Sequence, residues 1–438
     1  MPGWIVPVVP RGQVLQGQAL ALGAGRIVDI GPADTLAGRY QEAETLQLPK
    51  HVLLPGLVNA HGHAAMSLLR GVGDDLGLKP WLEQRIWPIE SKLVDRRFVA
   101  DGTELAIAEM VRSGTTCCND MYFFPDVAAA TAAGLGFRMS VGLIVIEFPS
   151  AWAANVDEYL ARGLEVRDEF RGEPLISTTL APHAPYTVCD PTLDRIQTLS
   201  AQLDIPVHIH LHETRAEVEE SINRHGCRPF ERLRAHGLIN EKLLAVHMTQ
   251  LSDREIQQAL RAGVSIAHCP ESNQKLASGA CPVEKLRQAG VNVALGTDGA
   301  AANNDLDLFG EMRSAALMGK LVAEDATAVP ACYALEMATI NGARALGLED
   351  QIGSLEPGKS ADLVALRFDR FATTPVYDVI SHLVYAAGRY AVSDVWIAGR
   401  RLLQDGQLTT IKEQDLLSRA QAWGVQISAT LEEVQKNA

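Results

Sequence analysis

The chain has 438 residues, of which 47% are hydrophobic and 21% charged, an ordinary globular composition that excludes disorder as the main state. Its 39 basic and 53 acidic residues give a formal charge of −14, which leaves no basic field for the phosphates of a nucleic acid. The sequence contains no run of 18 apolar residues and no basic, apolar leader. We therefore expect a soluble cytoplasmic protein without a membrane or nucleic-acid partner.

The cysteines do not form a recognisable framework. There are seven of them, at positions 117, 118, 189, 227, 269, 281 and 332, and no two are spaced as C-x-x-C. An odd number without such pairs argues against a disulfide scaffold and against a cysteine zinc knuckle. We expect reduced cysteines in and around a core.

Both ends of the chain predict short strands. Near the N-terminus, residues 4–9 are apolar and residues 26–31 partly alternate, and residues 361–366 and 395–400 have the same character near the C-terminus. We expect residues 1–57 and 351–438 to build one β-sandwich, with a helix at the C-terminal end.

Between them, residues 58–350 alternate β-branched apolar runs with longer helical stretches, a pattern typical of repeated βα units around a parallel sheet. The helical stretches include residues 96–113, 191–204 and 253–262. Eight candidate strands favour a (β/α)₈ TIM-like barrel, and so an α/β fold. They are residues 54–59, 114–120, 138–146, 176–181, 206–210, 244–247, 264–267 and 293–296.

Half of the twelve histidines lie at or just past the end of a candidate strand, which is the catalytic face of a parallel barrel. A single histidine there is most often a satisfied structural side chain, whereas six at one face indicate chemistry. They are His61, His63, His183, His210, His247 and His268. We expect His208, which shares the face of His210 but lies deeper, to have a packing role.

Four side chains form the candidate metal site. Alternate residues of a strand share a face, so His61 and His63 are placed to chelate together. His210 ends the fifth strand and Asp298 follows the eighth, and they join the pair if the barrel closes. Three imidazoles and one carboxylate favour zinc with an open position for water. The sequence has no lysine between 92 and 242, so strand four offers no carbamylated lysine to bridge a second ion.

The residues named so far resemble a known family. The string LPGLVNAHGH at 54–63, with His210-x-x-Glu213, His247 and Gly296-Thr297-Asp298, resembles the mononuclear aminohydrolase branch of the amidohydrolase superfamily. The segment at 353–364 is similar to the turn and strand with which such proteins re-enter their β module. Trp81, the WPIE motif at 87–90 and the APHAPY motif at 181–186 resemble the 5′-methylthioadenosine/S-adenosylhomocysteine deaminases.

The resemblance implies one zinc per subunit, a homodimer, and hydrolytic deamination of an adenine nucleoside. It implies that Glu90 binds the ribose hydroxyls and His183 contacts the purine. The matching positions give expected catalytic roles. Asp298 accepts the proton of the attacking water, Glu213 protonates N1 of the ring, and His247 holds the attacking hydroxide by a hydrogen bond.

The lack of an arginine after the third strand bears on which 5′ substituent the site accepts. Family members that use S-adenosylhomocysteine carry an arginine after the third strand for its amino-acid end, and residues 141–150 contain none. This favours the uncharged 5′-methylthioadenosine, while Arg138 and Arg162 stay open as substitutes.

Other motifs carry less weight. Residues 353–360 match the letters of a P-loop, but Pro357 removes a backbone donor and a strand follows instead of a helix. No G-x-G-x-x-G opens a helix, and the H-x-E and P-C-x-x-C motifs of the other zinc deaminases are absent. Two alternatives stay open: the same site acting on guanine or a triazine, and a barrel that binds without catalysis.

Overall fold

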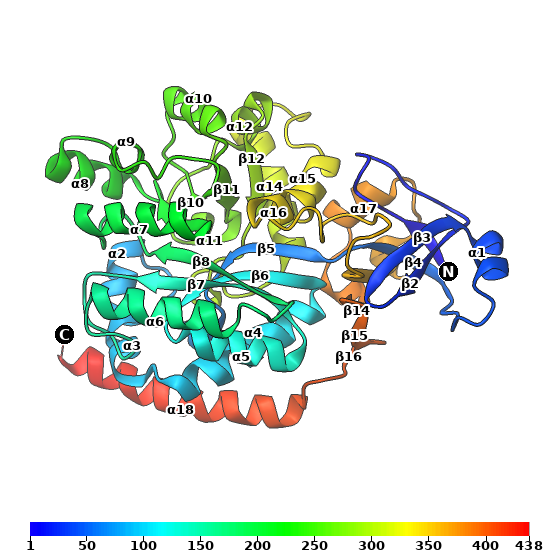
Figure 1. Cartoon of the computed structure of the whole chain (residues 1–438), viewed down its shortest axis with the longest axis horizontal. Coiled ribbons are helices and arrows are strands. Elements are labelled where there is room, and N and C mark those ends of the chain that lie inside the picture. The colour runs from blue at the N-terminus through cyan, green and yellow to red at the C-terminus, as the bar shows by residue number, and fades with distance from the viewer. Residues whose placement is uncertain (438) are drawn as a thin grey trace.

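The computed structural model describes residues 1–437, and eight parallel strands form its central sheet (Figure 1). In order around the sheet they are β5 (Leu57–Gly62), β6 (Thr115–Tyr122), β7 (Arg138–Val145), β8 (Ile176–Pro182), β9 (Val207–Leu211), β10 (Leu243–His247), β11 (Ser265–His268) and β12 (Asn292–Leu295). The first and last strands meet through a parallel bridge between Gly62 and Asp298. The predicted (β/α)₈ barrel is confirmed.

The seam between β5 and β12 depends on a residue without a side chain. A Cβ on Gly296 would lie 2.8 Å from the Cβ of His61, so the two backbones could not approach with any other residue there. The amide of Asp298 donates to the carbonyl of His61 at 3.1 Å across the same seam. The contacts that close the barrel therefore also place His61 beside Asp298.

Helices surround the sheet. Those next to the barrel strands include α4 (Arg96–Arg112), α5 (Pro125–Leu135), α6 (Val156–Glu169), α7 (Asp190–Leu203), α8 (Arg215–His225), α9 (Pro229–Ala235), α10 (Asp253–Ala262), α11 (Pro270–Lys275), α12 (Val283–Ala289), α13 (Ala300–Asn303), α14 (Leu308–Ala323), α15 (Ala331–Met337) and α16 (Ile340–Ala345). Local signals set their ends: Ser252 and Glu255 form a capping box that starts α10, and Gly263 at φ 73° ends it. The three predicted helical stretches lie within one residue of α4, α7 and α10.

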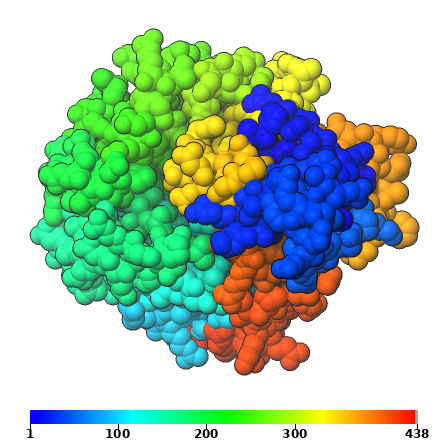
Figure 2. All heavy atoms as spheres, turned by 45° about the vertical axis from the view of Figure 1, so that its right-hand side comes forward, coloured from blue at the N-terminus to red at the C-terminus, as the bar shows by residue number. Residues whose placement is uncertain are grey.

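The two ends of the chain build a second module. A six-stranded mixed sheet has the order β1 (Pro2–Ile5), β4 (Leu48–Pro55), β13 (Leu363–Arg367), β14 (Val392–Ile397), β15 (Arg400–Gln404) and β16 (Gln407–Leu408), and β2 (Gln18–Gly23) pairs with β3 (Arg26–Pro32). Ile27 of the hairpin shares a buried cluster with Leu53, Leu363 and Trp396 of the sheet. Two layers over one core make the expected sandwich, and Figure 2 shows N-terminal and C-terminal segments side by side in it. The domain boundaries at 57 and 350 stay a prediction.

One predicted strand is wrong in its limits. Residues 54–59 span two strands, because β4 ends at Pro55 in the mixed sheet and β5 begins at Leu57 in the barrel. The apolar run is continuous in sequence, but its partner changes at Gly56, whose amide bonds to Asp362 while that of Leu57 bonds to Gly114. The apolar stretch at 4–9 is likewise strand only as far as Ile5.

A helical arm lies over the opening of the barrel. It consists of η1 (Ala64–Leu69), α2 (Leu78–Trp81), the π-helical turn η2 (Leu82–Ile86) and α3 (Trp87–Leu93). The C-terminal helix α18 (Glu413–Asn437) runs beneath α3 and α4 (Figure 1). Trp423 packs edge-on against Phe98 and donates to Asp101 at 2.9 Å, which fixes α18 to α4.

The barrel and the mixed sheet are tied by a buried ion pair. Arg138, at the start of β7, donates from Nε to Asp362 at 2.9 Å, and neither side chain is more than 6% exposed. The remaining helices are α1 (Ala33–Arg39) and α17 (Val379–Tyr385), with short 3₁₀ turns η3 (Phe371–Thr373) and η4 (Arg389–Ala391). Across residues 1–437, no helix combines the length and the apolar character needed to cross a membrane.

Candidate active site

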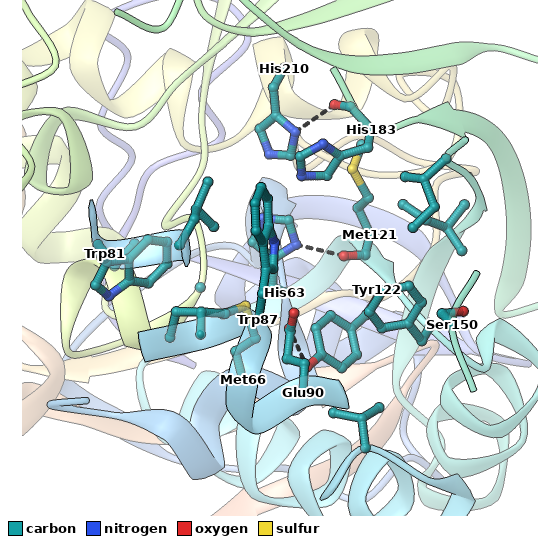
Figure 3. Close-up of a pocket in the computed structure, with 18 of the residues that line it drawn as sticks. His63, Met66, Trp81, Trp87, Glu90, Met121, Tyr122, Ser150, His183 and His210 are labelled. Carbon is teal, nitrogen blue, oxygen red and sulfur yellow. Dashed lines mark hydrogen bonds between the residues drawn. The ribbon is translucent and has the colours of Figure 1, made fainter. Parts of the chain in front are cut away.

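A cavity of about 580 Å³ opens at the carboxyl ends of the barrel strands, under the helical arm (Figure 3). Its wall is largely apolar and aromatic, with a small number of polar groups, as is usual for a small-molecule site. The apolar part includes Met66, Trp81, Trp87, Met121, Phe123 and Phe148. The polar part includes Glu90, His183, Tyr186, His210, Glu213 and Asp298.

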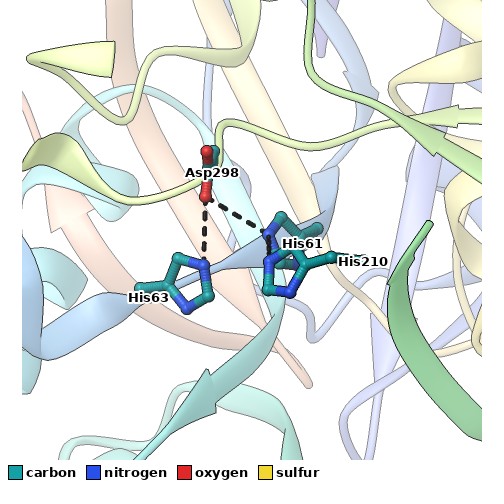
Figure 4. Close-up of side chains that lie close together, drawn as sticks. All are labelled: His61, His63, His210 and Asp298. Carbon is teal, nitrogen blue, oxygen red and sulfur yellow. Dashed lines mark hydrogen bonds and ion pairs between the residues drawn. The ribbon is translucent and has the colours of Figure 1, made fainter. Parts of the chain in front are cut away.

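The structure brings together the four side chains predicted as metal ligands (Figure 4). His61 lies within β5, His63 just after it, His210 within β9 and Asp298 after β12, and their candidate ligand atoms all lie within 4.8 Å of one another. The Oδ1 atom of Asp298 is 3.3 Å from Nε2 of His61 and 3.1 Å from Nε2 of His63. The Nε2 atoms of His61 and His210 are 3.2 Å apart.

The outer nitrogens of two rings show that the site fits a cation. His63 donates from Nδ1 to the carbonyl of Met121 at 2.5 Å, and His210 donates from Nδ1 to the carbonyl of His183 at 2.7 Å. Since a carbonyl only accepts, each Nδ1 carries a proton and each Nε2 points inward, where it offers a lone pair whenever the ring is neutral. Lone pairs that converge on a carboxylate repel one another unless a proton or a metal ion lies between them.

The charges of the site point the same way. Burial opposes ionisation of Asp298, but its hydrogen bonds with His61 and His63 hold its pKa well below the usual value. Burial also disfavours the charged form of His63, yet Asp298 raises its pKa to about 9. The proton that the metal-free site holds on His63 is the one that a bound metal ion would replace.

The backbone at Asp298 is strained. Its φ is +60°, a left-handed conformation that non-glycine residues seldom adopt and that is concentrated at functional sites. Ser272 donates to Oδ2 at 2.7 Å and the amide of Gly299 donates to Oδ1 at 2.8 Å, so both carboxylate oxygens are oriented.

His208 has a polar contact that its predicted packing role does not describe. It is fully buried, and its Nε2 lies 2.8 Å from Nδ1 of His61. Its own Nδ1 lies 3.1 Å from Nδ2 of Asn119, which also donates to the carbonyl of Ala60. All three candidate ligand rings are thus held from behind, one by a buried histidine and two by carbonyl oxygens.

Glu213 lies beside this group. Burial, and next the charge of Asp298, raise its pKa to about 8, so that its carboxyl is protonated at neutral pH in the metal-free protein. Ser278 donates to its Oε1 at 3.4 Å, and its Oε2 is 3.8 Å from Nε2 of His247. The Nδ1 atom of His247 faces the amide oxygen of Asn273 at 2.9 Å.

The two predicted substrate contacts lie on opposite sides of the cavity. Glu90, on α3, accepts a hydrogen bond from the hydroxyl of Tyr122 at 2.7 Å (Figure 3). His183, just past β8, has Nδ1 3.1 Å from the hydroxyl of Thr187, and burial lowers its pKa to about 3. A neutral imidazole and a carboxyl group therefore face the cavity from different walls.

Three other residues that the sequence analysis named do not line the cavity. His268 ends β11 as expected but does not line the cavity, and Arg138 is paired with Asp362 far from it. Arg162 lies over the ring of Trp152 and pairs with Glu158. Within residues 1–437, no lysine or arginine lines the cavity.

Sequence reasoning missed the supporting polar residues. They are single side chains in strands and loops with no diagnostic spacing. Only the partner that each one meets in space reveals its function. The set comprises Asn119, Tyr122, Ser272, Asn273 and Ser278.

Comparison with known proteins agrees with this geometry. The amidohydrolase family matches residues 52–402. Proteins named 5-methylthioadenosine/S-adenosylhomocysteine deaminase from Teredinibacter turnerae and Saccharophagus degradans are 48% and 45% identical to this chain, each over 97% of it and 96% of the relative. A crystal structure of an adenosine deaminase from Xanthomonas campestris with bound zinc is 50% identical over 98% of both chains, with a TM-score of 0.95.

A more distant structure shares the fold alone. An atrazine chlorohydrolase from Arthrobacter aurescens, complexed with zinc, is 22% identical and has a TM-score of 0.90 over 96% of this chain and 98% of its own. The family match over residues 52–402 and the full-length relatives establish the family. The chain belongs to the amidohydrolase family, with 5-methylthioadenosine/S-adenosylhomocysteine deaminases as full-length relatives.

Proposed function

We propose that this protein hydrolytically deaminates 5′-methylthioadenosine to the corresponding inosine and ammonia, with one zinc ion per subunit. The observation that carries the proposal is a buried carboxyl group, Glu213, protonated beside the four-residue candidate ligand set and facing a largely apolar cavity. The names of the full-length relatives and the zinc in one related structure support the same substrate class and metal.

His61, His63, His210 and Asp298 would hold the metal. A divalent ion in such a site supplies Lewis-acid activation of water at neutral pH. Asp298 is the base that accepts the proton of the water, because its carboxylate stays ionised there. Glu213 donates its proton to N1 of the purine, which makes C6 electrophilic. Its carboxylate then takes the proton of the new C6 hydroxyl and passes it to the amino group, so that ammonia leaves as the C6 carbonyl forms. The proton held by Asp298 returns Glu213 to its acid form. His247 orients the water by a hydrogen bond through Nε2.

Binding of the nucleoside divides between two walls. His183 faces the purine as a neutral hydrogen-bonding group, and Glu90 accepts hydrogen bonds from the ribose hydroxyls. Guanine or a triazine would leave the second carboxyl oxygen of Glu90, which Tyr122 does not contact, without a partner from the ligand, and this costs binding energy. The polar pair of Glu90 and Tyr122 therefore favours a nucleoside over a bare heterocycle.

The apolar wall favours an uncharged 5′ substituent. The two arginines that the sequence left open as partners for an amino-acid end are engaged elsewhere: Arg138 with Asp362, and Arg162 with Trp152 and Glu158. A charged homocysteine end would lose its hydration without gaining a cation in return. Since a hydrogen bond to a charged group contributes roughly 1.5–3 kcal/mol, we expect S-adenosylhomocysteine to have a kcat/KM about tenfold to hundredfold lower.

The test is the loss of adenine absorbance on zinc-loaded protein with 5′-methylthioadenosine, S-adenosylhomocysteine, adenosine and guanine, and ammonia release as the control. We expect the methylthio compound to lead. Turnover of guanine alone, or of no purine despite bound zinc, would overturn the assignment of Glu90 and His183 to a nucleoside.

A gain-of-function variant tests the substrate preference separately. Phe148 lines the cavity and is 40% exposed, so an arginine there can reach both the cavity and water. Phe148→Arg should raise kcat/KM for S-adenosylhomocysteine relative to 5′-methylthioadenosine, and Phe148→Gln is the neutral control. An equal ratio in the two variants would refute a charge-based preference. A cytoplasmic homodimer is part of the proposal and is checked by fractionation and sedimentation.

A further inference from the structure

The end of β6 contacts two groups that line the cavity on different sides, His63 of the candidate metal site and Glu90 of the helical arm. Its last two residues, Met121 and Tyr122, are adjacent in the chain. The carbonyl of Met121 accepts the Nδ1 proton of the metal ligand His63 at 2.5 Å. The hydroxyl of Tyr122 donates to Oε1 of Glu90 at 2.7 Å, and both contacts are visible in Figure 3.

Glu90 needs such a partner because its own element is not part of the barrel sheet. It lies on α3, a seven-residue helix that follows the π-helical turn of the arm. Its carboxyl is buried enough to raise its pKa above the usual value. Tyr122, by contrast, is 6% exposed and belongs to a strand paired with β7 through six residues, so its position is fixed.

We infer that Tyr122 is a positioning residue for ribose recognition: by holding Oε1 of Glu90, it turns Oε2 toward the cavity at a fixed distance from the metal ligands. The inference deepens the proposed function and rests on it. The end of β6 then sets the spacing between the purine and the ribose, because Met121 holds His63 beside the purine and Tyr122 holds Glu90 beside the ribose. A sugar that has lost its 2′-hydroxyl or its 3′-hydroxyl keeps only one hydroxyl for Glu90 and gains less from this arrangement.

The variant Tyr122→Phe keeps the ring and removes only the hydroxyl. Without that donor, Glu90 can rotate, and its carboxylate has to be reoriented each time a nucleoside binds. We expect kcat/KM for adenosine to fall about tenfold to hundredfold, chiefly through KM, because the hydroxyl does not touch the reacting atoms. For 2′-deoxyadenosine and 3′-deoxyadenosine we expect a much smaller loss, so that the preference for the ribonucleoside collapses.

The experiment measures kcat and KM for these three nucleosides on zinc-loaded wild type, Tyr122→Phe, Glu90→Gln and the double variant. If Tyr122 acts through Glu90, the double variant loses no more preference for adenosine than Glu90→Gln alone. Tyr40→Phe is the matched control, because its hydroxyl bonds to Asp29 at 3.4 Å in the terminal β module. Zinc content and thermal unfolding confirm that each variant is folded.

The outcomes distinguish a failure of the role of Tyr122 from a failure of the proposed function. If wild type prefers adenosine and Tyr122→Phe keeps that preference, the role of Tyr122 is refuted while the proposed function stands. If wild type deaminates no adenine nucleoside, the proposed function itself is wrong. If it deaminates the deoxynucleosides as well as adenosine, deamination stands, but the role of Glu90 in ribose binding is wrong and that of Tyr122 with it. A uniform loss in kcat for all three nucleosides would instead mark Tyr122 as merely structural and would also refute the inference.

Discussion

The buried acid Glu213 gives the sharpest prediction, because one substitution should remove activity and raise stability together. Glu213→Gln preserves the shape of a side chain that is 4% exposed, and it removes the proton that the proposed mechanism donates to N1. Positioned proton transfers contribute on the order of 10²–10⁴ in rate. We expect kcat to fall by that factor, with normal zinc content.

The stability effect follows from the pKa. In the folded, metal-free protein the pKa of Glu213 is raised to about 8, whereas its ordinary value is 4.5. Between these two values the unfolded chain is ionised and binds fewer protons than the folded protein, so raising the pH favours unfolding. Stability is lost from pH 4.5 upward, and the penalty is constant above pH 8. At pH 7 it amounts to about 2.5 pH units at roughly 1.36 kcal/mol each, which is on the order of 3 kcal/mol.

Glutamine does not titrate and carries none of this penalty. Urea unfolding of the metal-free wild type and Glu213→Gln at several pH values is the assay. We expect the two free energies of unfolding to be equal near pH 4.5 and the variant to be more stable at pH 7. Glu219→Gln on α8, where the side chain is 58% exposed, is the control and should change neither quantity. A stability difference that does not vary with pH, or near-normal turnover, would refute the reasoning.

Three other predictions concern the metal site and the joint between the two modules. His208→Gln should weaken zinc affinity about tenfold to hundredfold in a competition with a chromophoric chelator, because the ring of His61 loses its support; unchanged affinity would return His208 to a packing role. Arg138→Met should cost about 3–5 kcal/mol in urea unfolding, because Asp362 is left buried without its cation, and a loss below about 1 kcal/mol would contradict this. Removing zinc should lower the melting temperature, and adding zinc at 100 times its Kd should restore about 2.7 kcal/mol; a melting temperature independent of zinc would exclude binding to the folded state.

The repeating βα units, the limits of three helices and the four candidate ligand residues could be predicted from the sequence alone. These follow from local patterns: periodicity fixes strands and helices, and the H-x-H spacing fixes the face of His61 and His63. The two-module plan was predictable for the same reason, since both ends of the chain have strand patterns. The change of sheet at Gly56 was not, because an apolar run is identical in sequence whichever sheet it joins.

The three-dimensional arrangement was needed to show which atoms meet. It assigned the inward nitrogen of His63 and His210 through carbonyls far along the chain, and it placed His208 behind His61. It also joined Tyr122 to Glu90, which lies 32 residues earlier in the chain. Such contacts depend on strand register and on the packing of the arm over the barrel. No spacing within one segment carries that information, because the distance between two segments is set by everything that lies between and beneath them.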